Sequence, residues 1–144
     1  MKSIFNTLIL FVFLVFLSAC SPSGNLSIQD SWARPGFRGD NSAVYLTIKN
    51  LTDQHDGLIG ATCDVAGGAE IHLSKMDSSG TMTMERQDLV EVSASEVVQL
   101  APGGLHIMLI NLSKDLKIGD TFPITLEFQR AGDITVDVEV KQGN

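Results

Sequence analysis

The segment Thr121–Val140, TFPITLEFQRAGDITVDVEV, decides the fold. Apolar side chains occupy every second position in both of its halves: Phe122, Ile124, Leu126 and Phe128, then Ile134, Val136, Val138 and Val140. Such alternation is typical of a β-strand with one buried face, and Ala131–Asp133, between the halves, is rich in turn-forming residues. The segment is therefore predicted to form an antiparallel hairpin that covers a hydrophobic core.

Similar short apolar runs precede this hairpin. They occupy residues 26–33, 42–50, 57–65, 69–76, 81–87, 96–100 and 105–112. Turn-forming segments such as Asp77–Gly80 and Ala101–Gly104 separate them, and no run carries apolar residues at helical spacing. About nine short strands with this punctuation predict an all-β domain, either a Greek-key β-sandwich or a barrel.

Length, charge and motif content exclude several functions. The chain has 144 residues and a net charge of −7, from 17 acidic and 10 basic side chains. That length accommodates one ordinary domain, and an acidic surface disfavours binding to nucleic acid or anionic lipid. Since the sequence contains no nucleophile elbow, phosphate-binding loop, dinucleotide-binding loop or His-Glu-x-x-His motif, we expect no enzymatic activity.

The first 19 residues predict a signal peptide that is not part of the fold. Lys2 supplies a positive charge, and residues 4–16 form an apolar run too short to span a bilayer. The following Leu17–Cys20, LSAC, resembles the lipobox of bacterial lipoproteins, which implies lipidation of Cys20. An ordinary secretory signal is the alternative. Either way, we expect the protein to work outside the cytoplasm.

The lipobox resemblance divides the chain into three parts. Residues 1–19 would be removed, residues 20–25 would form the lipidated cysteine and a short tether, and residues 26–141 would form the folded domain. A multi-chain lipid at Cys20 gives stable anchoring. The predicted location is the periplasm, and Ser21 after the cysteine favours the outer membrane.

Lipidation of Cys20 would leave Cys63 as a single cysteine. An internal disulfide is then excluded, and the sequence has no Cys-x-x-Cys motif. We expect Cys63 to be a buried, unreactive thiol.

Histidine and methionine concentrate in the middle of the chain. The members of this group are His72, Met76, Met82, Met84, His106 and Met108. His106 and Met108 are two residues apart and share one face of an expected strand, as do Met82 and Met84. Pairing across the Asp77–Gly80 turn would bring His72 close to the Met82/Met84 strand, and the turn before His106 could place the third segment at the same end of the fold.

Two imidazoles and two thioethers form a donor set that suits Cu(I). Thioether sulfur is soft and uncharged, so it binds Cu(I) well and Zn²⁺, Ca²⁺ or Mg²⁺ poorly. Because the set has no thiolate, it favours Cu(I) over Cu(II) and resembles a blue-copper centre only in part. The alternative is structural, with methionines filling gaps in the core and a histidine satisfying a turn.

The order His72, Met84, His106-Ile-Met108 resembles the periplasmic copper chaperones of the PCu(A)C family. The interval of 21 residues between Met84 and His106 matches that family's pattern, and the interval of 11 between His72 and Met84 exceeds it by one residue. The surplus falls in the Asp77–Gly80 turn. Further segments resemble the family: Ser31–Pro35, Ser42–Asn50, Ala69–His72, Pro102–Met108 and Leu116–Thr121.

The resemblance implies a cupredoxin-like β-sandwich that binds one Cu(I). Its ligands would be His72, Met84, His106 and Met108, with Met82 and Met76 as substitutes. The resemblance also implies copper delivery by ligand exchange to an acceptor, either the copper subunit of cytochrome c oxidase or a Sco-type protein. Two alternatives stay open: a cupredoxin-like redox module, and an adhesion or assembly lipoprotein without metal.

Four further residues have simpler expected roles. His55 lies in a polar segment and should be solvated. Trp32 and Tyr45 should pack in or beside the core, with Trp32 also placed to border the metal. Arg34 should either pair with a carboxylate or stack on an aromatic ring.

Overall fold

A computed structural model describes residues 26–143. They form ten strands: β1 (Leu26–Ala33), β2 (Ser42–Asn50), β3 (Asp56–Thr62), β4 (Ala66–Met76), β5 (Met82–Arg86), β6 (Val90–Val92), β7 (Val97–Leu100), β8 (Leu105–Leu112), β9 (Thr121–Phe128) and β10 (Gly132–Val140). The all-β prediction is confirmed. Nothing in this part of the chain forms a helix able to cross a membrane. The predicted signal peptide, Cys20 and the tether lie outside the described residues.

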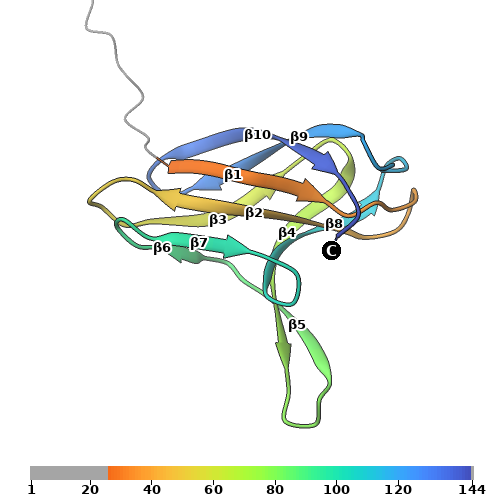
Figure 1. Cartoon of the computed structure of the whole chain (residues 1–144), viewed down its shortest axis with the longest axis horizontal. Helices are drawn as coiled ribbons and strands as arrows, with labels where there is room; N and C mark the ends of the chain where they lie inside the picture. The colour runs from red at the N-terminus through yellow and green to blue at the C-terminus, as the bar shows by residue number, and fades with distance from the viewer. Residues whose placement is uncertain (1–25, 144) are drawn as a thin grey trace, which may run out of the picture.

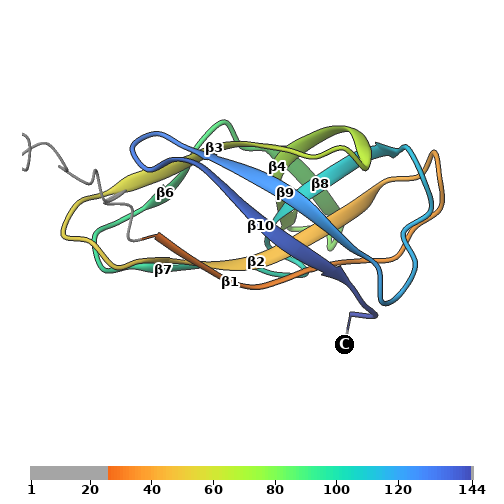
Figure 2. The same ribbon diagram turned by 90° about the horizontal axis from the view of Figure 1, so that it is seen from above.

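The strands form one continuous sheet that folds over a single core (Figures 1 and 2). The order along the sheet is β5-β4-β8-β2-β1-β10-β9-β3-β6, and β7 pairs with β2 off this path. The pairing of β1 with β10 is parallel, and the other strand pairs are antiparallel. Because β3 also packs against β4, the sheet closes into a sandwich. Its non-sequential strand order agrees with the predicted Greek-key connectivity.

The C-terminal hairpin has the predicted alternation. The inward side chains of β9 are buried: Phe122, Ile124, Leu126 and Phe128. The turn, however, lies at residues 129–131 and not at 131–133. Gly132 already pairs with Phe128, and its φ of 74° is a backbone conformation that glycine adopts without strain.

The sequence does not predict β6. Three residues are too few for an alternating pattern to be recognised. The strand is held by pairing with β3 and by the buried side chain of Asn50, whose amide group donates hydrogen bonds to the carbonyls of Val92 at 3.1 Å and Ser93 at 3.0 Å. Contacts across more than forty residues of sequence therefore define this strand.

The arrangement of β5, β4, β8 and β2 determines which side chains face outward. Ile71 of β4 and both Ile107 and Leu109 of β8 are buried in the core. The residues that alternate with them therefore lie on the outer face of the sheet. Among the described strands, β5 pairs with β4 alone, and the β4–β5 hairpin projects away from the sandwich in Figure 1.

We expect Leu126→Ala to lower the free energy of unfolding by about 2–5 kcal/mol, because it opens a cavity in the core. The control is Thr125→Ala, on the opposite face of β9, which should cost no more than about 1 kcal/mol. Urea unfolding followed by circular dichroism measures both values. Equal losses in the two variants would contradict the orientation of β9.

Candidate metal centre

Pairing between β4 and β8 brings two of the predicted ligands together. His72 lies directly opposite His106, and Glu70 lies directly opposite Met108. Ile107, which lies between His106 and Met108 along β8, is 0% exposed and belongs to the core. Since successive side chains of a strand point to opposite faces, the four residues share the outer face of adjacent strands.

The imidazole of His106 is buried and has one nitrogen available for a metal. The residue is only 4% exposed. Its Nδ1 lies 3.0 Å from the carbonyl oxygen of Gly104. Because a carbonyl only accepts hydrogen bonds, Nδ1 carries the proton and the lone pair is on Nε2. The ring centroid lies 5.9 Å from that of His72.

In the imidazole of His72 the roles of the two ring nitrogens are reversed relative to His106. Its Nε2 donates to the Glu70 carboxylate at 2.9 Å, so the lone pair of the neutral ring is on Nδ1. That Nδ1 atom is buried and has no hydrogen-bond partner among the described residues. A buried polar atom without a partner is energetically costly, and a metal ion bound there would satisfy it. The two histidines therefore fit a metal ion.

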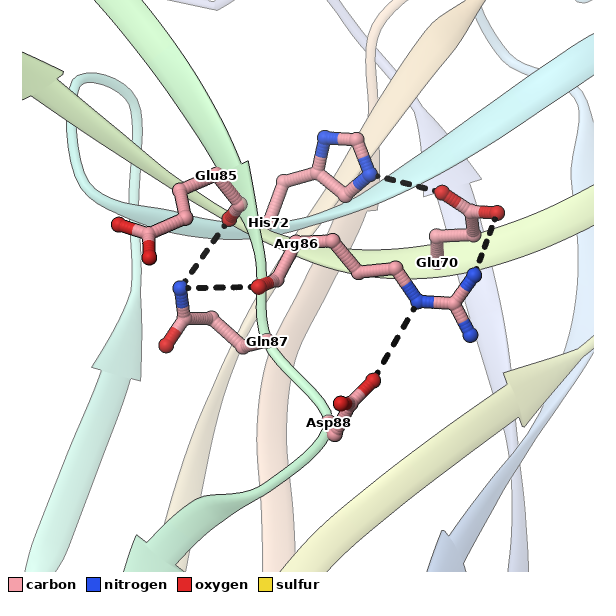
Figure 3. A network of polar contacts seen from close by, with 6 residues as sticks. All are labelled: Glu70, His72, Glu85, Arg86, Gln87 and Asp88. Atoms are coloured by element: carbon pink, nitrogen blue, oxygen red, sulfur yellow. Dashed lines mark hydrogen bonds and ion pairs between the residues drawn. The ribbon is translucent and has the colours of Figure 1, made fainter.

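A polar network holds Glu70 behind His72 (Figure 3). Nη1 of Arg86 lies 3.1 Å from Glu70, and Nε of Arg86 lies 3.5 Å from Asp88. The hydrogen bond from His72, assisted by the charge of Arg86, lowers the pKa of Glu70, which keeps this carboxyl ionised at neutral pH. A carboxylate in this position orients a metal-binding histidine and raises its basicity.

Two of the predicted methionine ligands flank the histidines. Met108 is half-buried beside His106 on the same face of β8. Met84 lies opposite Ser74, one step of two residues along the ladder from His72, and is 59% exposed. Long side chains reach diagonal neighbours across paired strands, so the Met84 thioether lies within reach of His72.

Met82 and Met76 lie further out on the hairpin. They pair directly with each other, two steps from His72, and are 48% and 68% exposed. The register therefore favours Met84 over Met82 as the methionine next to the histidines.

An aromatic row continues from the histidines across β2 to β1. The ring of Tyr45 lies 6.3 Å from that of His106 and 4.6 Å from that of Trp32. Tyr45 is buried and Trp32 is half-buried, and the two rings pack against each other outside the core cluster. Arg34 stacks on Tyr45 with its guanidinium 5.7 Å from the ring centroid, which settles the choice between stacking and pairing.

Sequence reasoning missed Glu70 and the contact of Tyr45 with His106. Glu70 stands two residues before His72, so strand alternation alone places both on one face, and this signal was available. The contact of Tyr45 depends on pairing between β2 and β8, which no local pattern encodes.

The remaining candidate residues lie elsewhere. His55 is exposed, as expected. Cys63 is half-buried next to Ala66 and not fully buried as expected, and this partial burial raises the pKa of its thiol. Ala66 is six residues before His72 on β4, roughly 20 Å away at strand spacing. Residues 26–143 contain no cluster of three or more His, Cys, Asp or Glu side chains suited to a metal.

Solved PCuAC domains share this fold. The chain is similar to the copper-bound PCuAC domain from PmoF2, with 27% identity and a TM-score of 0.70 over 83% of this chain and 95% of that one. It is similar to the apo PCuAC domain from PmoF1, with 26% identity and a TM-score of 0.71 over 83% and 96%. It is also similar to Cu(I)-DR1885 from Deinococcus radiodurans, with 26% identity and a TM-score of 0.63 over 87% of each chain. The fold defines an all-β, cupredoxin-like domain of the PCuAC type.

The sequence relatives name the family. Residues 26–140 match the model of the LpqE-like family, described as putative lipoproteins, and the chain belongs to this family. It is 33% identical over 118 residues to an uncharacterized protein of Rickettsia prowazekii, covering 78% of this chain and 65% of that protein. It is 27% identical over 116 residues to a putative lipoprotein of Leifsonia xyli subsp. xyli, covering 81% and 69%.

We expect the imidazoles of His72 and His106 to adopt opposite tautomers in the metal-free protein. Nitrogen-15 NMR at a pH where the rings are neutral should show the proton of His106 on Nδ1 and that of His72 on Nε2, because Gly104 and Glu70 accept these bonds. Exposed His55 is the control and should show no fixed tautomer. A proton on Nε2 of His106 would contradict the assigned donor atom.

Proposed function

We propose that this protein is an extracytoplasmic copper carrier that binds one Cu(I). The ligands are Nδ1 of His72, Nε2 of His106 and the thioethers of Met84 and Met108. The observation that carries the proposal is the buried Nδ1 of His72, which has no hydrogen-bond partner within residues 26–143, beside the available Nε2 of His106. The similarity to the copper-bound PmoF2 domain and to Cu(I)-DR1885 supports copper as the metal.

The chemistry of the donors supports the monovalent ion. Thioether and neutral imidazole are uncharged, and soft sulfur prefers Cu(I). A blue-copper centre needs a cysteine thiolate, and Cys63 lies next to Ala66, which is roughly 20 Å along β4 from His72. The site therefore favours transport of copper over electron transfer.

Delivery follows from the different accessibility of the four ligands. The His106 imidazole is buried and fixed by hydrogen bonding, whereas Met84 is 59% exposed. An incoming thiolate or imidazole displaces the exposed thioether first and the imidazoles last, so copper never leaves as a free ion. The oxidation state of copper does not change in this exchange. Suitable acceptors are the copper subunit of cytochrome c oxidase and a Sco-type thiol protein.

Lipid anchoring through Cys20 completes the proposal. The match to a family of putative lipoproteins supports it, and Ser21 favours the outer membrane. The first described residue, Leu26, pairs with Asn50 at one end of β2, whereas Met108 pairs with Ala43 near the other end. The described domain therefore begins at the end of the sandwich away from the metal site, and an anchor before Leu26 would leave the site accessible to a partner.

Anaerobic titration of the domain from Ser21 with Cu(I), in competition with a chromogenic chelator, tests the proposal. We expect the parent to bind one equivalent tightly and the His106→Ala/Met108→Ala variant to lose that binding. Equal, weak binding by both proteins would overturn the proposal.

Two single variants identify the third ligand in the same titration. Met84→Leu should weaken Cu(I) binding, because Met84 is one step from His72. Met82→Leu is the matched control on the same strand and should leave the affinity close to that of the parent. The reverse order would assign the ligand to Met82.

Glu70→Ala should weaken Cu(I) binding by about 10- to 100-fold, because His72 loses the carboxylate that orients it. Glu85→Ala is the control: Glu85 lies on the other face of the hairpin and pairs with Lys75. Nitrogen-15 NMR should also show that His72 no longer has a fixed tautomer in Glu70→Ala alone. Unchanged affinity and an unchanged tautomer would show that Glu70 does not position His72.

A further inference from the structure

The outer half of the β4–β5 hairpin has a feature that the four-ligand site does not use. Met76 and Met82 are directly opposite each other and are 68% and 48% exposed. Methionine is among the residues most often buried, and this pair lies on the part of the hairpin that projects from the sandwich (Figure 1).

The ladder register places this pair in line with the inner site. Starting at His72 and moving outward, the successive pairs on the same face are His72 with Arg86, Ser74 with Met84, and Met76 with Met82. Met84 is therefore one step from the inner histidine and one step from the outer methionine pair. Three thioethers occupy neighbouring positions on one face of a two-stranded ribbon.

The geometry of a directly opposed pair allows both sulfurs to reach one ion. Side chains directly opposite each other have Cβ atoms about 4.5–5.5 Å apart, and methionine is long, unbranched and flexible. The ammonium group of Lys75 lies on the other face of the hairpin, where its Nζ pairs with Glu85 at 2.6 Å. Arg86, opposite His72, lies on the methionine face, and its guanidinium pairs with Glu70 and Asp88. Among the described residues of the hairpin, a cation approaching Met76 and Met82 therefore meets no ammonium group.

The turn at the tip holds the two methionines in register. The Asp77 carboxylate accepts hydrogen bonds from the backbone amides of Ser79 and Thr81, both at 2.9 Å, and the amide of Asp77 donates to the carbonyl of Thr81 at 2.9 Å. Gly80 completes the turn with a φ of 83°. The pairing of Met76 with Met82 directly precedes this fixed turn.

We propose that Met76 and Met82 form an outer, transient Cu(I) site through which the ion enters and leaves the inner site. This inference rests on the proposed function. Copper bound by the two outer thioethers gains the Met84 thioether, then the imidazole of His72, and releases Met76 and Met82 as the inner bonds form. The ion stays Cu(I) throughout, and every step exchanges one neutral donor for another.

An outer site on the transfer route has a distinctive kinetic effect. It speeds loading and release by the same factor, because both directions cross the same intermediate. It leaves the equilibrium affinity of the inner site unchanged. Kinetics and equilibrium therefore separate an outer transfer site from an inner ligand.

Stopped-flow transfer of Cu(I) between a chromogenic chelator and the domain from Ser21 provides the test. In Met76→Leu/Met82→Leu we expect loading and release rates to fall together by about tenfold, within the range by which association rates vary among variants of one site. The dissociation constant should not change. Adding Lys75→Met/Thr83→Met to this variant restores a methionine pair at a directly opposed position on the wrong face, and should not restore the rates.

A spectroscopic measurement observes the outer site directly. In the His106→Ala/Met108→Ala variant, labelled at its methionine methyl groups, sub-stoichiometric Cu(I) should shift the resonances of Met76 and Met82. Absence of these shifts, or transfer rates unaffected by Met76→Leu/Met82→Leu in a parent that binds one Cu(I), would overturn the outer site alone. A parent that binds no Cu(I) would overturn the proposed function and the outer site together.

Discussion

The alignment of β4 with β8 is the constraint on which the site depends. His72 lies opposite His106 because Ile71 and Ile107, their neighbours on the same strands, are both buried in the core. A slip of one residue would move these apolar side chains to the outer face and the histidines inward. Burial of apolar side chains therefore sets the separation of the imidazoles before any ion binds.

The four proposed ligands divide into a rigid pair and an adaptable pair. The imidazoles are positioned by hydrogen bonds to Gly104 and Glu70. The thioethers have no such restraint, and methionine is intrinsically flexible. A carrier needs both kinds of donor, since rigid ligands retain the ion during transit and flexible ones let an acceptor replace them without a free intermediate.

Local patterns predicted most of the fold and the members of the candidate site. Alternation identified the long strands and placed His106 and Met108 on one face. It could not show that His72 pairs with His106, because that contact joins strands 34 residues apart and depends on competition among all possible pairings. For the same reason the short strand β6 and the contact of Tyr45 with His106 were missed. The hydrogen bond from His72 to Glu70 was within reach of sequence reasoning, since both residues lie on one strand.

Because the β4–β5 hairpin closes in a turn, the number of residues between His72 and Met84 does not determine the distance between their side chains. Residues 77–81 lie outside the ladder, because Met76 already pairs with Met82. An insertion or deletion in this loop changes the interval between His72 and Met84 without moving either side chain to the other face. Members of a lineage could therefore differ in loop length while keeping the same donors, and a search that demands a fixed interval would overlook some of them.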